Sequence, residues 1–341
     1  PIALMSLEQA YNTYNVNTVY ENESREYLSN PTEWYGDMPP ISLFAADYTN
    51  KNLTILADSV YPEAQPQIFS ISGKKVLIFT TDNDNRTSEN KQMLVYSVYN
   101  DEEGTWSEAV PVNDDGTADF YPTASGEYLV WQNQKSVMGD GLSLAEIGKQ
   151  GEIVIAKWNG NGVDDPVSLT DNDSLDTLPK VSVNNNEISV VWLKNSADDI
   201  LGVDGDTSIV KKVYNGSVWG EEIVLKDNLN AVTDLSVGYS DNALNVAYVH
   251  DVDDDITTID DREVYLIGSS EKQVTDNEVL DSNAIINEGT LYWYSENNIQ
   301  FMNLADSSVS TVFEDARYAL ADGFTVSEDN GNIAILWSGS E

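Results

Sequence analysis

Short apolar runs recur along the chain from residue 66 onward, and Asn, Asp and Gly separate them. In each unit, a strand-like run is followed by a turn and then by an alternating run that ends in an aromatic residue. The clearest copies are residues 66–79, ending at Phe79, and residues 179–192, ending at Trp192. Looser copies end at Trp131, Tyr248, Tyr294 and Trp337. Short runs with a period of two and polar boundaries predict β-strands rather than helices.

Two more strand-like runs follow most of these copies, so each unit predicts four antiparallel strands. The third strands are predicted at 93–99, 153–158, 209–214, 263–267 and 299–304. The fourth strands are predicted at 109–112, 167–169, 222–225 and 308–313. Four strands in a unit of about 40–60 residues are typical of a β-propeller blade. Six copies therefore predict six blades.

The two ends of the chain predict how such a ring closes. The sixth unit stops at Trp337–Glu341 after two strands, while the runs Ile41–Ala45 and Leu53–Ala57 have no place in the repeat. Completing the last blade with strands from the other terminus removes exposed sheet edges. We therefore predict an all-β, six-bladed propeller over residues 40–341, closed by N-terminal strands. Residues 1–39 are expected to form an N-terminal extension with no predicted role.

Two predicted outer hairpins carry a Gly followed closely by a Trp. They read Gly104-Thr-Trp106 and Gly216-Ser-Val-Trp219, each just before an outer strand. The pattern resembles the Asp-box repeat of sialidase-like propellers, although the Ser and Asp of that motif are absent. A sialidase would need an arginine cluster to hold the substrate carboxylate. The chain has only Arg25, Arg86, Arg262 and Arg317.

Composition removes several classes of function. The chain has 58 Asp and Glu against 17 Lys and Arg, a net charge of −41, so nucleic acid is not expected as a partner. With no Cys, it has no disulfide, thiolate nucleophile or zinc finger. A Ser-His-Asp relay would have to use the single histidine, His250. We interpret His250 as structural.

The acidic residues are concentrated in particular loops. In a propeller, the loops between second and third strands share one face with the loops between blades, and here both sets are rich in Asp. This predicts a strongly negative face, which would concentrate cations. Three interpretations stay open: Asp side chains that cap turns, a solvated surface, or a cation site. The capping interpretation applies to a column that follows the blade period, Asp114, Asp171, Asp227 and Asp276.

The loop after residue 250 is the richest in acid. It reads Asp251-Val-Asp-Asp-Asp255 and continues to Asp260 and Asp261. Calcium takes six to eight oxygen ligands, commonly from closely spaced carboxylates. The spacing resembles the start of a calcium loop, without the Gly at position six and the Glu at position twelve. The sequence predicts a calcium ion held by Asp251, Asp253 and Asp255.

No catalytic constellation stands out. A glycosidase needs two carboxylates about 5–9.5 Å apart, and among 58 acids some pair meets this by chance. We predict a non-catalytic binding module, extracellular or on a bacterial cell surface. It is expected to be monomeric, to insert in no membrane, and to hold a carbohydrate or protein ligand on the acidic face. The alternative is a glycoside hydrolase, which an acid pair converging with aromatics on the central channel would favour.

Aromatic residues divide into two groups. Those that recur with the blade, such as Phe79, Trp131 and Trp192, are predicted to form core between blades. Aromatics outside the repeat, namely Trp34, Tyr35 and Trp293, are predicted to offer an exposed stacking surface. The chain begins at Pro1 without a Met, so we expect it to be a piece of a longer protein.

Overall fold

The computed structural model describes most of the chain from residue 66 onward and three short segments before it. The described ranges are 2–6, 41–47, 52–60, 66–83, 85–139, 141–160, 162–196, 199–200, 202–253, 258–314, 324–329 and 332–337. All structural statements below concern these residues.

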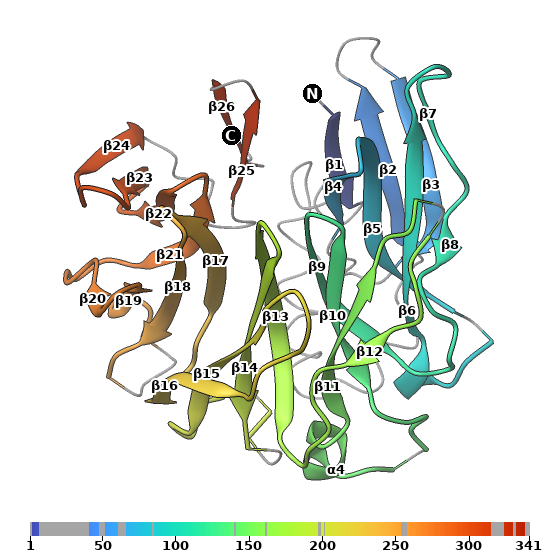
Figure 1. The fold of residues 1–341 in the computed structure, drawn as a ribbon, viewed down its shortest axis with the longest axis horizontal. Helices are drawn as coiled ribbons and strands as arrows, with labels where there is room; N and C mark the ends of the chain where they lie inside the picture. The colour runs from blue at the N-terminus through green and yellow to red at the C-terminus, as the bar shows by residue number, and fades with distance from the viewer. Residues whose placement is uncertain are drawn as a thin grey trace, which may run out of the picture.

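Five antiparallel sheets follow one another along the chain, and each is built from strands adjacent in sequence (Figure 1). The first contains β4 (Gln67–Ile71), β5 (Lys74–Asp82), β6 (Gln92–Asn100), β7 (Thr105–Trp106) and β8 (Val110–Pro111). The second contains β9 (Asp119–Ser125), β10 (Tyr128–Gln134), β11 (Gly151–Lys157) and β12 (Val167–Ser168). The third contains β13 (Leu175–Asn184), β14 (Glu187–Asn195), β15 (Thr207–Tyr214) and β16 (Ile223–Leu229).

The remaining two sheets repeat the same order. The fourth contains β17 (Asp234–Ser240), β18 (Ala243–Asp251), β19 (Arg262–Ile267) and β20 (Glu271–Gln273). The fifth contains β21 (Asp281–Asn287), β22 (Thr290–Ser295), β23 (Asn298–Asn303) and β24 (Val309–Phe313). The first strand of each sheet contacts the first strand of the next, so these strands lie innermost. We call the five sheets blades one to five. The prediction of an all-β chain is confirmed, and so are four antiparallel strands in blades two to five, whereas blade one has five strands.

The second strand of each blade is covered on both faces, because neighbouring blades pack against it. In β14, every residue from Ile188 to Leu193 is buried. Trp131 and Trp192 pack on the preceding blade, the first against Ile78 and the second against Val130. This burial explains the nearly continuous apolar runs in the sequence. Truncating such an aromatic side chain costs about 3–5 kcal/mol.

Trp293 corrects one sequence prediction. It was expected to be exposed, but only 2% of it is accessible, and it packs on Val249 and Val264 of blade four. Register explains the error. Asp281 pairs with Ser295 as Asp176 pairs with Lys194, so Trp293, rather than Tyr294, is the counterpart of Trp192. Trp34 and Tyr35 lie outside the described residues.

The two chain ends form smaller sheets. β1 (Ile2–Ser6), β2 (Ile41–Asp47) and β3 (Asn52–Val60) make a three-stranded sheet that contacts β5, and both strands expected near residues 41 and 53 are present. β25 (Phe324–Asp329) and β26 (Asn332–Trp337) pair only with each other in the described ranges. Phe324 packs on Tyr292 of blade five, and Figure 1 shows β25 and β26 between that blade and β1. The count of six blades and its closure remain predictions.

Helical structure is sparse in the described ranges. The short helix α4 (Leu144–Gly148) follows β10, and a reciprocal capping box between Ser143 and Glu146 begins it. A helix able to cross a membrane, which must be long and apolar, was not found among the described residues.

Candidate functional site

Buried acids hold the blade junctions together. Between blades two and three, the Asn172 backbone N–H donates to Glu152 at 2.9 Å, and its side-chain amide donates to Asp176 at 2.6 Å. Both carboxyl groups are almost fully buried. Because a buried polar group without a partner costs free energy, the asparagine stabilises the two acids where the chain passes from one blade to the next.

The same arrangement recurs between blades four and five. The Asn277 backbone N–H donates to Glu263 at 2.8 Å, and its amide donates to Asp281 at 2.9 Å. Burial raises the pKa of Glu263, and the hydrogen-bonded carboxyl of Asp281 raises it further. We call this pair of hydrogen bonds from one asparagine to two buried acids a junction clasp. In the sequence it corresponds to Thr-Asp-Asn followed by Asp, at 170–176 and at 275–281.

Turn capping falls one residue later than predicted. The side chains that accept a backbone N–H two residues on belong to Asp115, Asn172 and Asn277. The preceding acids Asp114 and Asp171 instead form ion pairs with Arg86 and Lys135. At these positions the capping side chain is therefore the residue after the predicted aspartate, because the carboxylate of the aspartate itself is drawn to a cation.

The tryptophans at the equivalent position of blades two and three donate hydrogen bonds to buried aspartates. Trp131 donates its indole N–H to Asp119 at 2.8 Å, and Trp192 donates to Asp176 at 2.7 Å. Burial raises the pKa of both aspartates to about 6, against the hydrogen bonds that they accept. In blade five, the equivalent atoms, Trp293 Nε1 and Asp281 Oδ1, have no partner within hydrogen-bonding distance. These acids lie inside the blade contacts, away from solvent.

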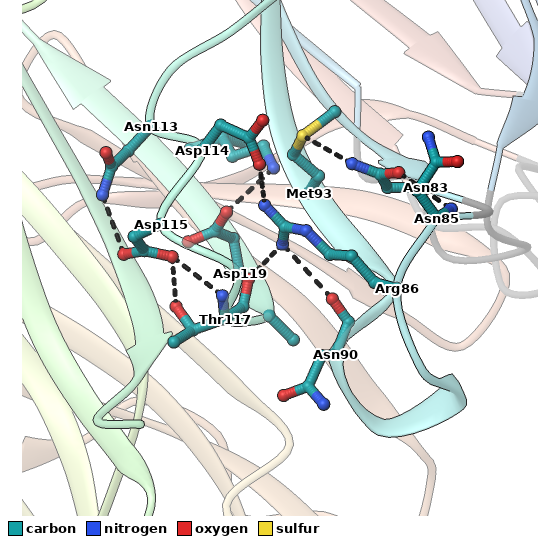
Figure 2. A network of polar contacts seen from close by, with 12 residues as sticks. Asn83, Asn85, Arg86, Asn90, Met93, Asn113, Asp114, Asp115, Thr117 and Asp119 are labelled. Carbon is teal, nitrogen blue, oxygen red and sulfur yellow. Dashed lines mark hydrogen bonds and ion pairs between the residues drawn. The ribbon is translucent and has the colours of Figure 1, made fainter. Parts of the chain in front are cut away.

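Arg86 uses its guanidinium for contacts between blades one and two (Figure 2). Its guanidinium donates to the carbonyl oxygens of Asn90 and Thr117 and pairs with Asp114, and only 8% of its side chain is exposed. Arg262 lies on blade four, with Nε 3.8 Å from Asp251 Oδ2. The arginine cluster of a sialidase is not assembled from these two residues. Arg25 and Arg317 lie outside the described ranges.

His250 packs as a structural side chain. Its ring lies 5.7 Å from the ring of Tyr248 and 4.8 Å from that of Tyr265. Its Nδ1 is 2.9 Å from the carbonyl oxygen of Asp251. These ring contacts and this hydrogen bond agree with the interpretation of His250 as structural.

The first strands of blades two, three and five share a bulge that blades one and four lack. In β9, β13 and β21, the strand bulges two residues after its aspartate, and a left-handed residue occupies the bulge: Tyr121 at φ 50°, Leu178 at φ 49° and Asn283 at φ 56°. Left-handed backbone is strained for side chains such as Tyr and Leu. In contrast, β17 pairs with β18 without interruption from Asp234, and β4 pairs with β5 without interruption in blade one.

An acidic cluster also lies on blade four. One oxygen from each of Asp251, Asp253 and Asp261 lies within 4.8 Å of the others. The Asp253 backbone N–H donates to Asp261 at 3.0 Å, which turns the loop back on itself. Desolvation by burial raises the pKa of Asp261. Hydrogen bonds from backbone N–H groups, chiefly that of Asp253, outweigh this effect and lower the pKa below its usual value. Carboxylates at this spacing could hold a metal ion.

Of the three predicted metal ligands, Asp251 and Asp253 lie close together, and Asp255 lies outside the described residues. Their binding of a metal ion stays a prediction. Asp261 was not predicted as a ligand, because its approach depends on the return of the loop rather than on local spacing. The geometry does not distinguish calcium from another cation.

No protein-family model matches the chain, and no curated protein matches it. Among solved structures, a mutant of Trypanosoma rangeli sialidase displaying trans-sialidase activity matches with a TM-score of 0.50 at 13% identity, over 86% of this chain and 54% of that one. A prolyl endopeptidase matches with a TM-score of 0.50 at 11% identity, over 87% and 42%. Penicillium chrysogenum α-L-arabinanase complexed with arabinobiose matches with a TM-score of 0.45 at 11% identity, over 88% and 81%.

These likenesses concern the fold alone. The likeness to the sialidase structure supports the propeller-like fold that the sequence predicts. The chain spans about half the length of the sialidase chain.

Proposed function

We propose that this chain is a non-catalytic binding module that holds a carbohydrate on its loop face, beside a calcium ion on blade four. The observation that carries the proposal is the acidic cluster of blade four, where one carboxylate oxygen from each of Asp251, Asp253 and Asp261 lies within 4.8 Å of the others. An extracellular or cell-surface location and a monomeric state belong to the same proposal.

The fate of the buried acids favours binding over catalysis. A glycoside hydrolase needs a carboxylic acid and a carboxylate that both reach the substrate. Glu152 and Asp176 are instead bonded within a junction clasp, and so are Glu263 and Asp281. The aromatics of the second strands are buried between blades as well. They are Phe79, Trp131, Trp192, Tyr248 and Trp293.

A calcium ion at this cluster would have coordination positions that sugar hydroxyl groups can fill. Three carboxylates supply fewer than the six to eight oxygens that calcium takes, unless each binds with both oxygens. Water or the hydroxyl groups of a sugar can fill the remaining positions. Arg262 competes for the same charge, since its Nε lies 3.8 Å from Asp251. Protein remains the second class of ligand for this face.

The six-bladed ring is part of the proposal. The contacts of β25 with β21 and of β3 with β5 support it, because they set the two end sheets against blade five and blade one. Removal of residues 1–60 would then expose the edges of both neighbours. We expect that truncation to cause cooperative loss of the whole fold, whereas an independent N-terminal sheet would leave the melting transition unchanged.

A thermal melt tests the cation. An ion that binds only the folded state at a hundredfold excess over its Kd stabilises by about 2.7 kcal/mol, a shift of about 2–4 °C for a chain of this size. We expect this shift with calcium at fixed ionic strength, and its loss in Asp253→Asn with Asp261→Asn. The exposed pair Asp173→Asn with Asp276→Asn is the control. Equal shifts with magnesium and sodium would indicate simple screening.

A panel of chromogenic glycosides tests the absence of catalysis. The proposal predicts no turnover above that of a heat-denatured sample. Robust release of chromophore from any glycoside would establish the alternative, a glycoside hydrolase, and would overturn the proposal.

A further inference from the structure

Lys180 lies on an innermost strand and has no protein partner among the described residues. Six described lysines hold a carboxylate within 4.0 Å: Lys75, Lys91, Lys135, Lys157, Lys194 and Lys226. Lys180 has neither a hydrogen bond nor an ion pair with any described residue. Burial lowers the pKa of its ammonium group, and the charge of Asp234 opposes that effect. Lys180 is half-buried, so its three N–H donors, which no described residue accepts, are open to water or to a ligand.

The position of Lys180 is set by its strand. It lies on β13, the innermost strand of blade three. Val181 and Val183 on the same strand pack toward blade two. Because successive strand residues point to opposite faces, Lys180 projects toward blade four, where Asp234 begins the innermost strand β17.

One carboxylate oxygen of Asp234 accepts hydrogen bonds from the protein, and the other is open to a ligand. Its Oδ2 accepts the Asn283 backbone N–H at 3.1 Å and the Thr233 hydroxyl at 3.2 Å. Its Oδ1 accepts nothing from the described residues. Burial raises the pKa of Asp234, while those two hydrogen bonds and the charges of Lys180 and Arg262 oppose the rise. The ammonium and the carboxylate therefore interact, yet they lie more than 4.0 Å apart.

We propose that Lys180 and Asp234 form a ligand position between the inner strands of blades three and four, and that its ligand is a neutral polyhydroxylated compound, a carbohydrate. A hydroxyl group accepts a hydrogen bond from the ammonium and donates one to the carboxylate, so one sugar satisfies both. Asp234 and the net charge of −41 repel an anion. Lys180 repels a cation. The inference rests on the proposed function and adds a second contact region for the same ligand class.

The experiment compares three forms of the whole chain: wild type, Lys180→Met and the control Lys149→Met. Lys149 is exposed and has no described ion pair. Each form is titrated calorimetrically with a panel of neutral oligosaccharides and with one uronic acid oligomer. Removing a charge-assisted hydrogen bond weakens binding roughly tenfold or more. We expect that loss in Lys180→Met, wild-type affinity in Lys149→Met, and weaker binding of the uronic acid oligomer.

A second measurement uses wild type alone, so it does not depend on the folding of a variant. Lysines are methylated reductively with formaldehyde, with and without the bound oligosaccharide, and mapped by mass spectrometry. The ligand should slow methylation of Lys180 at least several-fold and leave Lys149 unchanged.

The outcomes separate the two proposals. A carbohydrate that binds Lys180→Met as tightly as wild type, or that leaves Lys180 methylation unchanged, overturns this inference and leaves the proposed function standing. If wild type binds no carbohydrate, the proposed function fails and this inference fails with it. If Lys180→Met does not fold, the methylation result decides.

Discussion

The buried Asp119 should make the chain more stable in mild acid, and Asp119→Asn should remove part of that effect. Burial raises the pKa of Asp119 from 3.8 to about 6 in the folded chain. The folded state therefore binds more protons than the unfolded state between these values, so this group's contribution to stability falls as pH rises through that window. The residue is 1% exposed, and solvent screens it little.

The magnitude follows from the shift. A folded-state pKa of about 6 and an unfolded-state pKa near 3.8 give about 1 kcal/mol of extra stability at pH 5 relative to pH 7. The lower pH of the comparison stays above the isoelectric point of about 4.1. At the isoelectric point itself the chain would precipitate more readily. Asparagine keeps an acceptor for the Trp131 indole and removes the titration.

Urea unfolding at pH 5 and pH 7 measures the effect. Wild type should gain about 1 kcal/mol more than Asp119→Asn on acidification, while the exposed control Asp173→Asn should gain as much as wild type. The difference between variants cancels the general relief of charge repulsion, which both share. Equal gains for wild type and Asp119→Asn would refute the raised pKa and the burial argument behind it.

Two further predictions concern hydrogen bonds in the blade contacts. Trp192→Phe removes the indole N–H that donates to Asp176, whereas Trp293 Nε1 has no such partner. Trp192→Phe should therefore lower the free energy of unfolding by about 1–3 kcal/mol more than Trp293→Phe does. Equal losses for the two variants in urea unfolding would contradict this. Arg86→Met leaves Asp114 and the Thr117 carbonyl without their cation and should cost about 1–3 kcal/mol, whereas Lys149→Met should lie within about 0.5 kcal/mol of wild type.

The strands could be predicted because their sequence signal is strong. The second strand of each blade is buried on both faces, so its apolar run is nearly unbroken, as in Ile188–Leu193. Where two aromatics are adjacent, pattern alone fails. Trp293 and Tyr294 both end an apolar run, and a bulge in the paired strand decides which of them enters the core.

The site could be predicted only in part, for a similar reason. Asp251 and Asp253 are near neighbours in sequence, whereas Asp261 reaches them through a backbone hydrogen bond to Asp253. The hydrogen bond from Asn172 to Glu152 joins the start of β11 to the loop before β13, 20 residues along the chain, so the spacing within one loop does not predict it. The only sequence signal for it is the repeat of Thr-Asp-Asn at 170–172 and 275–277.

Glycan-array binding measured with calcium and with chelator tests the central claim most directly. The account predicts that wild type binds a carbohydrate in calcium, that chelator abolishes the binding, and that Asp253→Asn with Asp261→Asn abolishes it too. Asp173→Asn with Asp276→Asn, also on exposed acids, should bind as wild type does. The account would be contradicted if no glycan bound, or if binding took place equally well with chelator and in the Asp253 and Asp261 variant.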